Sequence, residues 1–194
     1  MWDTYVNLTV AHPLPMAFVQ FVLLGTLGEV ASMMLRTGQR RYPFSARKTA
    51  LKALTWGLLG LYIKLMFLTA TAGVTAMAGH DLLPRELAAP ASFGARLAAA
   101  FAAATLMNVM FGPSMMLLHR LADNGIDRLL GERPIGWAGL DKSMATLIWL
   151  WIPLQTFNFM QPQELRMGIA AFFSLLLGVI MGFFSRPRAA SADT

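Results

Sequence analysis

Long apolar runs divide the chain into segments that polar or turn-forming residues separate. They cover residues 14–35, 51–77, 93–118, 143–160 and 162–185. Each run approaches or exceeds about 20 residues, the length that a helix needs to cross the hydrocarbon core of a bilayer. The pattern predicts an all-α, polytopic membrane protein in which residues 1–185 form a single bundle of about five transmembrane helices. Residues 186–194 are small and polar, and are predicted to form a short disordered tail.

The fourth apolar run carries polar groups on one side. Four residues recur at helical spacing and share a face: Trp151, Gln155, Asn158 and Pro162. An amide in hydrocarbon is costly unless it is hydrogen-bonded, so this face is predicted to point toward other helices or a wet cavity. Two interpretations stay open. The amides line a solute path, or they bond to Thr105 and Asn108 of the third run as ordinary interhelical contacts.

Small residues recur every four positions in the first and last runs. They are Gly28 and Ser32 in the first run, and Ser174, Gly178 and Gly182 in the last. Such spacing predicts faces on which helices approach closely. In the third run, Gly112-Pro113 predicts a kink.

Composition agrees with a membrane setting. Hydrophobic residues make up 56% of the 194 residues and charged residues only 13%, with a mean hydropathy of +0.54. Soluble domains carry roughly 25% charged residues, so this chain could not cover a surface in water. No removable signal peptide is expected, because residues 1–13 contain no Lys or Arg and the first run carries Glu29.

Basic residues lie mostly on one side of the predicted bundle. Twelve fall between or beside the runs on that side: Arg36, Arg40, Arg41, Arg47, Lys48, Lys52, Arg120, Arg128, Arg133, Lys142, Arg186 and Arg188. The other side receives three: Arg85, Arg96 and Arg166. This bias predicts an amino terminus outside and a carboxyl terminus that is cytoplasmic, or matrix-facing in an organelle.

The net charge of +6 is therefore interpreted as a topology signal. The basic side is predicted to contact anionic lipid in an inner membrane, either that of a cell or that of an organelle if the protein is eukaryotic. No nucleic-acid partner is predicted.

Two ionisable residues are predicted to lie well inside the apolar runs, Glu29 and Lys64. A charge in that position costs on the order of 2.5–3.5 kcal/mol, so a partner is expected. The rise of 1.5 Å per residue and the lean of side chains toward the helix amino terminus bring the two heads to similar depth. We hypothesise a Glu29–Lys64 ion pair. The alternative is that Lys64 extends to the interface while Glu29 bonds locally.

Catalytic chemistry has little support in the sequence. The absence of cysteine excludes disulfides and thiol catalysis, and no phosphate loop or zinc motif is visible. A serine enzyme would need Ser114 and His119 on one helix without an evident orienting carboxylate. His119 is interpreted as an interfacial residue rather than a ligand or proton relay. We expect no enzymatic activity, no metal and no cofactor.

The polar face of the fourth run also resembles a family signature. Trp151, Pro153, Gln155, Asn158-Phe159, Pro162 and Arg166 resemble the carboxyl-terminal motif of the Mpv17/PMP22 family of small integral membrane proteins. Gly112-Pro113 with Arg120 and Asp123, Gly28-Glu29 and Lys48-Thr49 are similar to further elements of that family. The resemblance implies a multi-helix pore or solute channel of an inner membrane, with no cofactor.

Together these observations predict a membrane channel or transporter that passes a small polar or anionic solute. Its polar lining would be Gln155, Asn158, Asn108 and Lys64, with Glu29 neutralising Lys64. The alternative is a non-catalytic structural or assembly subunit. Its small-residue faces on the first and last runs would then contact a membrane-protein partner or a second copy.

Overall fold

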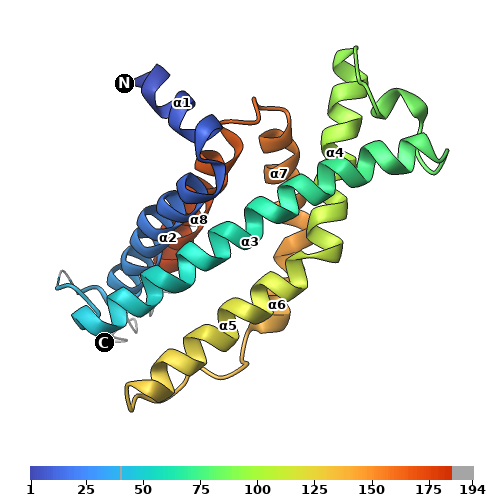
Figure 1. The fold of residues 1–194 in the computed structure, drawn as a ribbon. Coiled ribbons are helices and arrows are strands. Elements are labelled where there is room, and N and C mark those ends of the chain that lie inside the picture. The colour runs from blue at the N-terminus through green and yellow to red at the C-terminus, as the bar shows by residue number, and fades with distance from the viewer. Residues whose placement is uncertain (40, 185–194) are drawn as a thin grey trace, which may run out of the picture.

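The structure, a computed structural model, describes residues 1–39 and 41–184, and every regular element in these ranges is a helix (Figure 1). The all-α prediction is therefore confirmed, whereas the predicted tail at 186–194 lies outside the described residues. The elements are α1 (Trp2–Ala11), α2 (Pro13–Thr37), α3 (Ala46–Gly79), the 3₁₀ turn η1 (Arg85–Leu87), α4 (Phe93–Met110), α5 (Gly112–Leu129), α6 (Leu140–Thr146), the π-helical turn η2 (Leu147–Trp151), α7 (Ile152–Phe159) and α8 (Arg166–Phe184).

Among the described residues, four helices are long and apolar enough to cross a membrane: α2, α3, α4 and α8. They correspond to the first, second, third and fifth predicted runs. Many of their large apolar side chains face outward, as Leu23, Leu58 and Phe172 do. A protein in water does not leave so much apolar surface uncovered, whereas acyl chains would cover it.

The third predicted run is divided at Phe111. α4 ends at Met110 and α5 begins at Gly112, which confirms the break predicted from Gly112-Pro113. Proline has no N–H to continue the helical bonding and suits the first turn of a new helix. α5 then continues to Leu129, past the end of the apolar run at residue 118.

The fourth predicted run consists of three consecutive helical pieces, α6, η2 and α7. Pro153 explains the break. Its nitrogen cannot donate to the carbonyl of Trp149, and its ring would clash with that carbonyl in a regular α-helix. The chain widens over Leu147–Trp151 into a π-helical turn, which relieves this conflict just before the proline.

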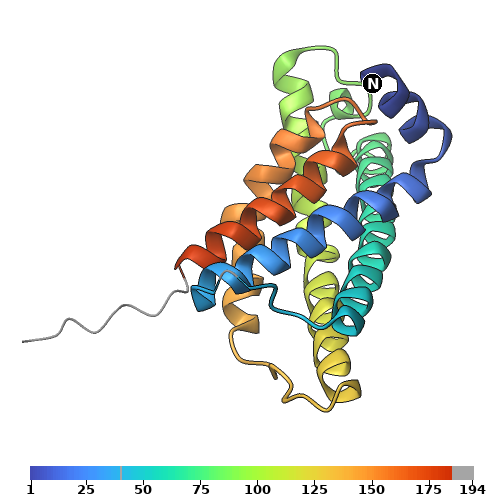
Figure 2. The ribbon, with the colours of Figure 1, turned by 90° about the vertical axis from the view of Figure 1, so that its left-hand side faces the viewer.

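α2 packs between α3 and α8 (Figure 2). The small-residue faces of α2 and α8 meet each other, because Gly28 opposes Gly178 and Ser32 opposes Gly182. A Cβ atom on Gly182 would lie 2.6 Å from the carbonyl oxygen of Ser32. The two predicted packing faces are thus used within the bundle.

The carboxyl-terminal end of α3 leads into a loop that neutralises one of its own charges. Arg85 donates from Nε and Nη2 to the carboxylate of Asp81, at 2.5 and 2.9 Å. This hydrogen bonding lowers the pKa of Asp81 below its ordinary value. The Arg85 charge is therefore balanced locally.

Candidate functional site

α3 and α5 run antiparallel and oppose each other along one charged face. α3 presents Lys48, Lys52 and Trp56, and α5 presents Asp127, Asp123 and His119, in matching order. Both sets have a spacing of four residues, which places each set on one side of its helix. This register explains why α5 extends past the apolar run, since its last turns carry the acidic partners of α3.

Lys52 lies at the centre of this face and is only 3% exposed. Its Nζ donates to the carboxylate of Glu29 on α2 and to Oδ1 of Asp123 at 2.9 Å. The second oxygen of Glu29 accepts a hydrogen bond from Nε1 of Trp56 at 3.0 Å. A buried charge is tolerable only when it is paired and hydrogen-bonded, and these contacts meet that condition for Lys52 and Glu29. We call Glu29, Lys52, Trp56, His119 and Asp123 the charge cluster.

Lys48 forms a second set of ion pairs one turn closer to the start of α3. Its Nζ donates to Oδ1 of Asp127 at 2.7 Å and to Oε2 of Glu132 at 2.6 Å. The ring of Phe44 lies near both lysines, 5.7 Å from Nζ of Lys48 and 5.5 Å from Nζ of Lys52. The loop before α3 is thereby held against the same face.

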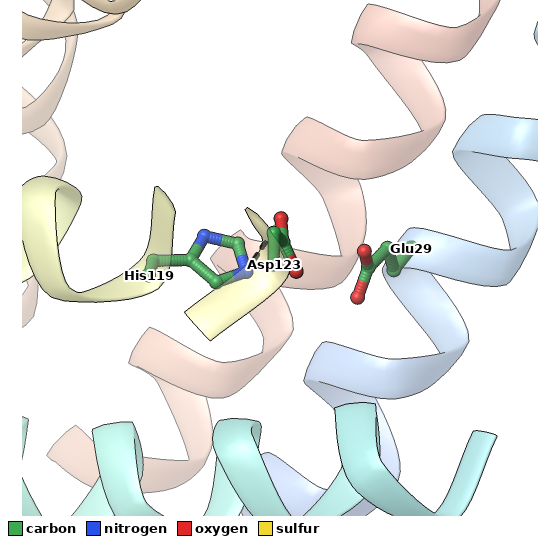
Figure 3. A group of neighbouring side chains, drawn as sticks. All are labelled: Glu29, His119 and Asp123. Atoms are coloured by element: carbon green, nitrogen blue, oxygen red, sulfur yellow. Dashed lines mark ion pairs between the residues drawn. The ribbon is translucent and has the colours of Figure 1, made fainter. Parts of the chain in front are cut away.

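Figure 3 shows that His119 and Asp123 face each other while Glu29 approaches from α2. Nε2 of His119 lies 3.8 Å from Oδ2 of Asp123, and the imidazole ring packs on Trp56 with centroids 4.6 Å apart. The ligand atoms of Glu29, His119 and Asp123 lie within 4.8 Å of one another. Zinc accepts such a set of donors. However, the ammonium group of Lys52 already binds both carboxylates, and a metal ion would have to displace it.

The predicted Glu29–Lys64 ion pair is wrong. Glu29 binds Lys52 and Trp56 instead. The sequence placed Lys52 at the start of the second span, whereas α3 begins at Ala46, so Lys52 lies within the helix and reaches α2. Lys64 is twelve residues further on, about 18 Å along the axis. Its ammonium group has no ion pair or hydrogen bond among the described residues, and the charge that acts on it is the like charge of Arg166.

The amide face of the fourth run is buried, as predicted. Trp151, Gln155 and Asn158 are 8%, 4% and 0% exposed, whereas Pro162 is exposed at the turn. Nδ2 of Asn158 donates to Oε1 of Gln155 and to the backbone oxygen of Arg166, both at 3.0 Å. These bonds stay within the α7–α8 connection, and neither amide bonds to Thr105 or Asn108 in the part of the chain that the structure describes.

Arg166 closes the same connection. Its guanidinium donates to the carbonyl oxygens of Phe159 and Gln161, both at 2.9 Å, and lies over the ring of Phe159. The carbonyls at the end of a helix lack partners within it, and Arg166 supplies them. The residues from Trp151 to Arg166 that resemble a family motif thus form a helical hairpin, and hydrogen bonds hold its connection in place.

Two cavities lie one above the other between α3, α4 and α7. The inner one has a volume of about 40 Å³, and its lining includes Tyr62, Asn108, Trp151, Gln155 and Ser174. This is enough for one to three water molecules. Nε1 of the buried Trp151 has no hydrogen-bond partner among the described residues.

The outer cavity is larger, about 290 Å³, and its lining includes Thr71, Thr75, Arg96, Phe159 and Arg166. It lies further along α3 and α7 than the inner cavity and nearer the start of α4. Phe159, which lines the outer cavity, packs on the ring of Phe67 with centroids 4.9 Å apart, and along α3 Phe67 falls between the residues that line the two cavities. Lys64, predicted to line the path, lines neither cavity.

Ser114 and His119 are not brought together. The hydroxyl group of Ser114 bonds to the hydroxyl group of Tyr62 at 2.6 Å and to the carbonyl oxygen of Phe111. A serine–histidine pair needs a direct hydrogen bond between the two side chains. The described geometry does not provide one.

Sequence reasoning missed the charge cluster as a group, and predicted a buried ionic role only for Glu29. The signal for the rest was present in the four-residue spacing of Lys48 and Lys52 and of Asp123 and Asp127. Comparisons with family models, with curated proteins and with solved structures found no match to this chain. The resemblance to the Mpv17/PMP22 family therefore stays a prediction.

Proposed function

We propose that this protein passes a small polar solute across an inner membrane as a channel or transporter. The observation that carries the proposal is the stacking of two cavities along the same three helices. The inner cavity exposes Asn108 and Gln155, and the outer one opens beside Arg96 and Arg166. Both cavities are largely apolar, but polar side chains contribute to their linings at successive depths, which a helical bundle that served only as packing would not need.

The proposed topology has five crossings: α2, α3, α4 with α5, the combined α6–η2–α7 segment, and α8. In the proposed orientation the amino terminus lies outside and the carboxyl terminus is cytoplasmic. The reason is that basic residues gather at the helix ends on the same side as the carboxyl terminus. In this orientation the charge cluster lies toward the cytoplasmic side and the larger cavity opens outside. Anionic lipid would contact Arg36, Arg41 and Arg47.

In this proposal the structure represents a closed state. The Phe67–Phe159 ring pair separates the cavities, and the charge cluster blocks the cytoplasmic end. A solute entering the inner cavity would find the buried N–H of Trp151 without an acceptor, and could supply one. Passage then requires the rings to move apart.

The assembly alternative loses the feature that favoured it. The glycine-containing faces of α2 and α8 were to contact partners, but they pack against each other. A bundle that uses these faces internally presents mainly Leu outward, with Phe and Val next in number. We therefore favour solute passage.

The test is flux through purified protein in liposomes, measured with a set of small polar solutes. Asn108→Leu is expected to lower the flux at least severalfold, because it replaces a polar group in the lining of the inner cavity by an apolar one with the same number of side-chain heavy atoms. Asn108 bonds only to the carbonyl of Ala104 within its own helix, so the fold should tolerate this change. Asn158→Leu is less suitable, because it would break the α7–α8 connection.

The matched control is Thr69→Val, which changes a polar side chain on the exposed surface of α3. It should leave flux unchanged. Folded wild-type protein that passes none of the solutes would refute the proposal and favour the assembly role.

A further inference from the structure

We infer that the outer cavity binds a small organic anion through carboxylate or phosphate oxygens. The inference deepens the proposed function and rests on it for the role of the bound anion as the solute. The binding site itself rests on the charges and dimensions of the cavity.

The charged side chains that line the cavity are both arginines. Arg96 is exposed and forms no ion pair or hydrogen bond through its side chain within the described residues. Arg166 uses Nε and one Nη2 hydrogen for carbonyl oxygens, which leaves the other N–H groups of its guanidinium available. Guanidinium groups fit the oxygens of carboxylate and phosphate better than any other side chain does.

The protein provides little countercharge here. Lys64 adds a further unpaired cation near Arg166, and within the described residues only Glu164 offsets the Arg166 charge. Glu164 forms no ion pair with Arg166 within 4.0 Å. This contrasts with the charge cluster, where the lysine has two carboxylate partners. Unpaired cations beside an apolar span are costly, and a bound anion would reduce that cost.

The backbone adds to the same positive field. α8 begins at Arg166, and the first N–H groups of a helix lack partners within it. The hydroxyl groups of Thr71 and Thr75 are less available to bind an anion, because they already donate to the backbone oxygens of Phe67 and Thr71. Recognition would therefore depend on charge.

The volume of the cavity is compatible with a small organic ligand. On the scale that gives one to three water molecules for the inner cavity, 290 Å³ holds roughly 7–20 water-sized groups. A four-carbon dicarboxylate or a small phosphate ester fits within this volume. The narrow boundary at Phe67 and Phe159 would hold such an anion in the outer cavity until the rings separate.

Isothermal titration calorimetry on detergent-solubilised protein tests the inference with succinate and inorganic phosphate as probes, at ionic strength matched with sodium chloride. We expect saturable binding of at least one probe, and Arg96→Gln should weaken it about tenfold. Arg96 forms no side-chain hydrogen bond or ion pair in the described part of the chain, and circular dichroism would check that the variant is folded. The control is Arg85→Gln, on the same outer side, where the charge is already balanced by Asp81.

Binding that Arg96→Gln weakens and Arg85→Gln leaves within twofold supports the inference. No binding of either probe, or an equal loss in both variants, overturns it. The assay needs no transport. Binding without liposome flux would therefore refute only the proposed function, whereas flux without binding would refute only the anion site.

Discussion

At the scale of single residues, two lysines on α3 illustrate how differently a membrane helix can accommodate a cation. Lys52 is buried between two carboxylates, and Lys64 is half-buried with no partner in the described residues. A paired buried charge destabilises the fold when its partner is removed, whereas an unpaired buried charge already destabilises it. The two positions should therefore respond in opposite ways to the same substitution.

We expect Lys52→Met to lower the free energy of unfolding by about 3–5 kcal/mol, because Glu29 and Asp123 would remain buried without a cation. Lys64→Met is the matched control, and should cause no loss of stability. Denaturation in mixed detergent micelles, followed by tryptophan fluorescence, measures both. A Lys64 variant as damaged as the Lys52 variant would contradict the assignment of the ion pairs.

The sequence could predict which single residues are buried better than which ones pair. The amide face of Gln155 and Asn158 follows from the cost of polar groups in hydrocarbon, and both side chains are buried. The partner of Glu29 depends on where α3 begins and on how α5 aligns with it. Lys52 precedes the longest apolar stretch, so the sequence placed it at the start of the span, although α3 begins at Ala46 and Lys52 lies within it.

At the scale of elements, the contact between α2 and α8 depends on backbone proximity. A Cβ atom on Gly28 would lie 2.8 Å from Cα of Leu175 and 3.0 Å from the carbonyl oxygen of Ser174. Both neighbours are backbone atoms, which cannot rotate away. The four-residue spacing predicted the surface, but it could not predict that the first and last spans would share it.

Gly28→Ala is expected to destabilise the bundle by about 1–3 kcal/mol, the usual range for overpacking at a rigid contact. Gly94→Ala provides the comparison. Gly94 lies in the first turn of α4, and no atom lies within 4 Å of the position that an alanine Cβ would take, so this change should be neutral or slightly stabilising. Thermal unfolding of the two variants measures the difference. Equal unfolding midpoints for Gly28→Ala and Gly94→Ala would contradict the close contact between α2 and α8.

Of the two breaks within helical runs, the one at Gly112-Pro113 was predicted and the one before Pro153 was not. Gly112-Pro113 marks the division between α4 and α5, as expected. Pro153 also marks a break, but the resulting π-helical turn lies upstream of the proline. A proline specifies which hydrogen bond is lost, whereas the packing of the surrounding helices decides how the chain adapts.

At the scale of the whole molecule, polar groups form a discontinuous column along α3. It runs from the charge cluster through the Tyr62–Ser114 hydrogen bond and the inner cavity to the outer cavity. Hydropathy predicted the membrane class of the fold, because long apolar runs are unambiguous. The column itself depends on contacts between distant segments, which a linear pattern does not contain.

The natural lack of cysteine allows this column to be probed directly. Thr75→Cys, in the outer cavity, should react readily with a water-soluble thiol reagent applied from outside. Ser174→Cys, in the inner cavity, should react at least severalfold more slowly, because the Phe67–Phe159 rings lie between. Adding Phe67→Ala should raise the Ser174→Cys rate toward that of Thr75→Cys. Leu23→Cys, on the outward apolar surface of α2, should stay unreactive in liposomes.

Equal reaction rates at Thr75→Cys and Ser174→Cys in the presence of Phe67 would show that the aromatic pair is no barrier. An unreactive Ser174→Cys after Phe67→Ala would show that the cavities are unconnected. Either result would remove the basis for a closed path at this boundary.

The close packing of α2 against α8 also means that the bundle cannot finish folding until α8 has been synthesised. Ribosomes add about 5–20 residues per second, so α2 reaches the bilayer on the order of ten seconds before α8 has been made. During that interval its glycine-bearing side must face lipid or a chaperone. Nascent chains halted before residue 166 should therefore remain sensitive to protease, and completion of the last helix should convert them to the resistant form.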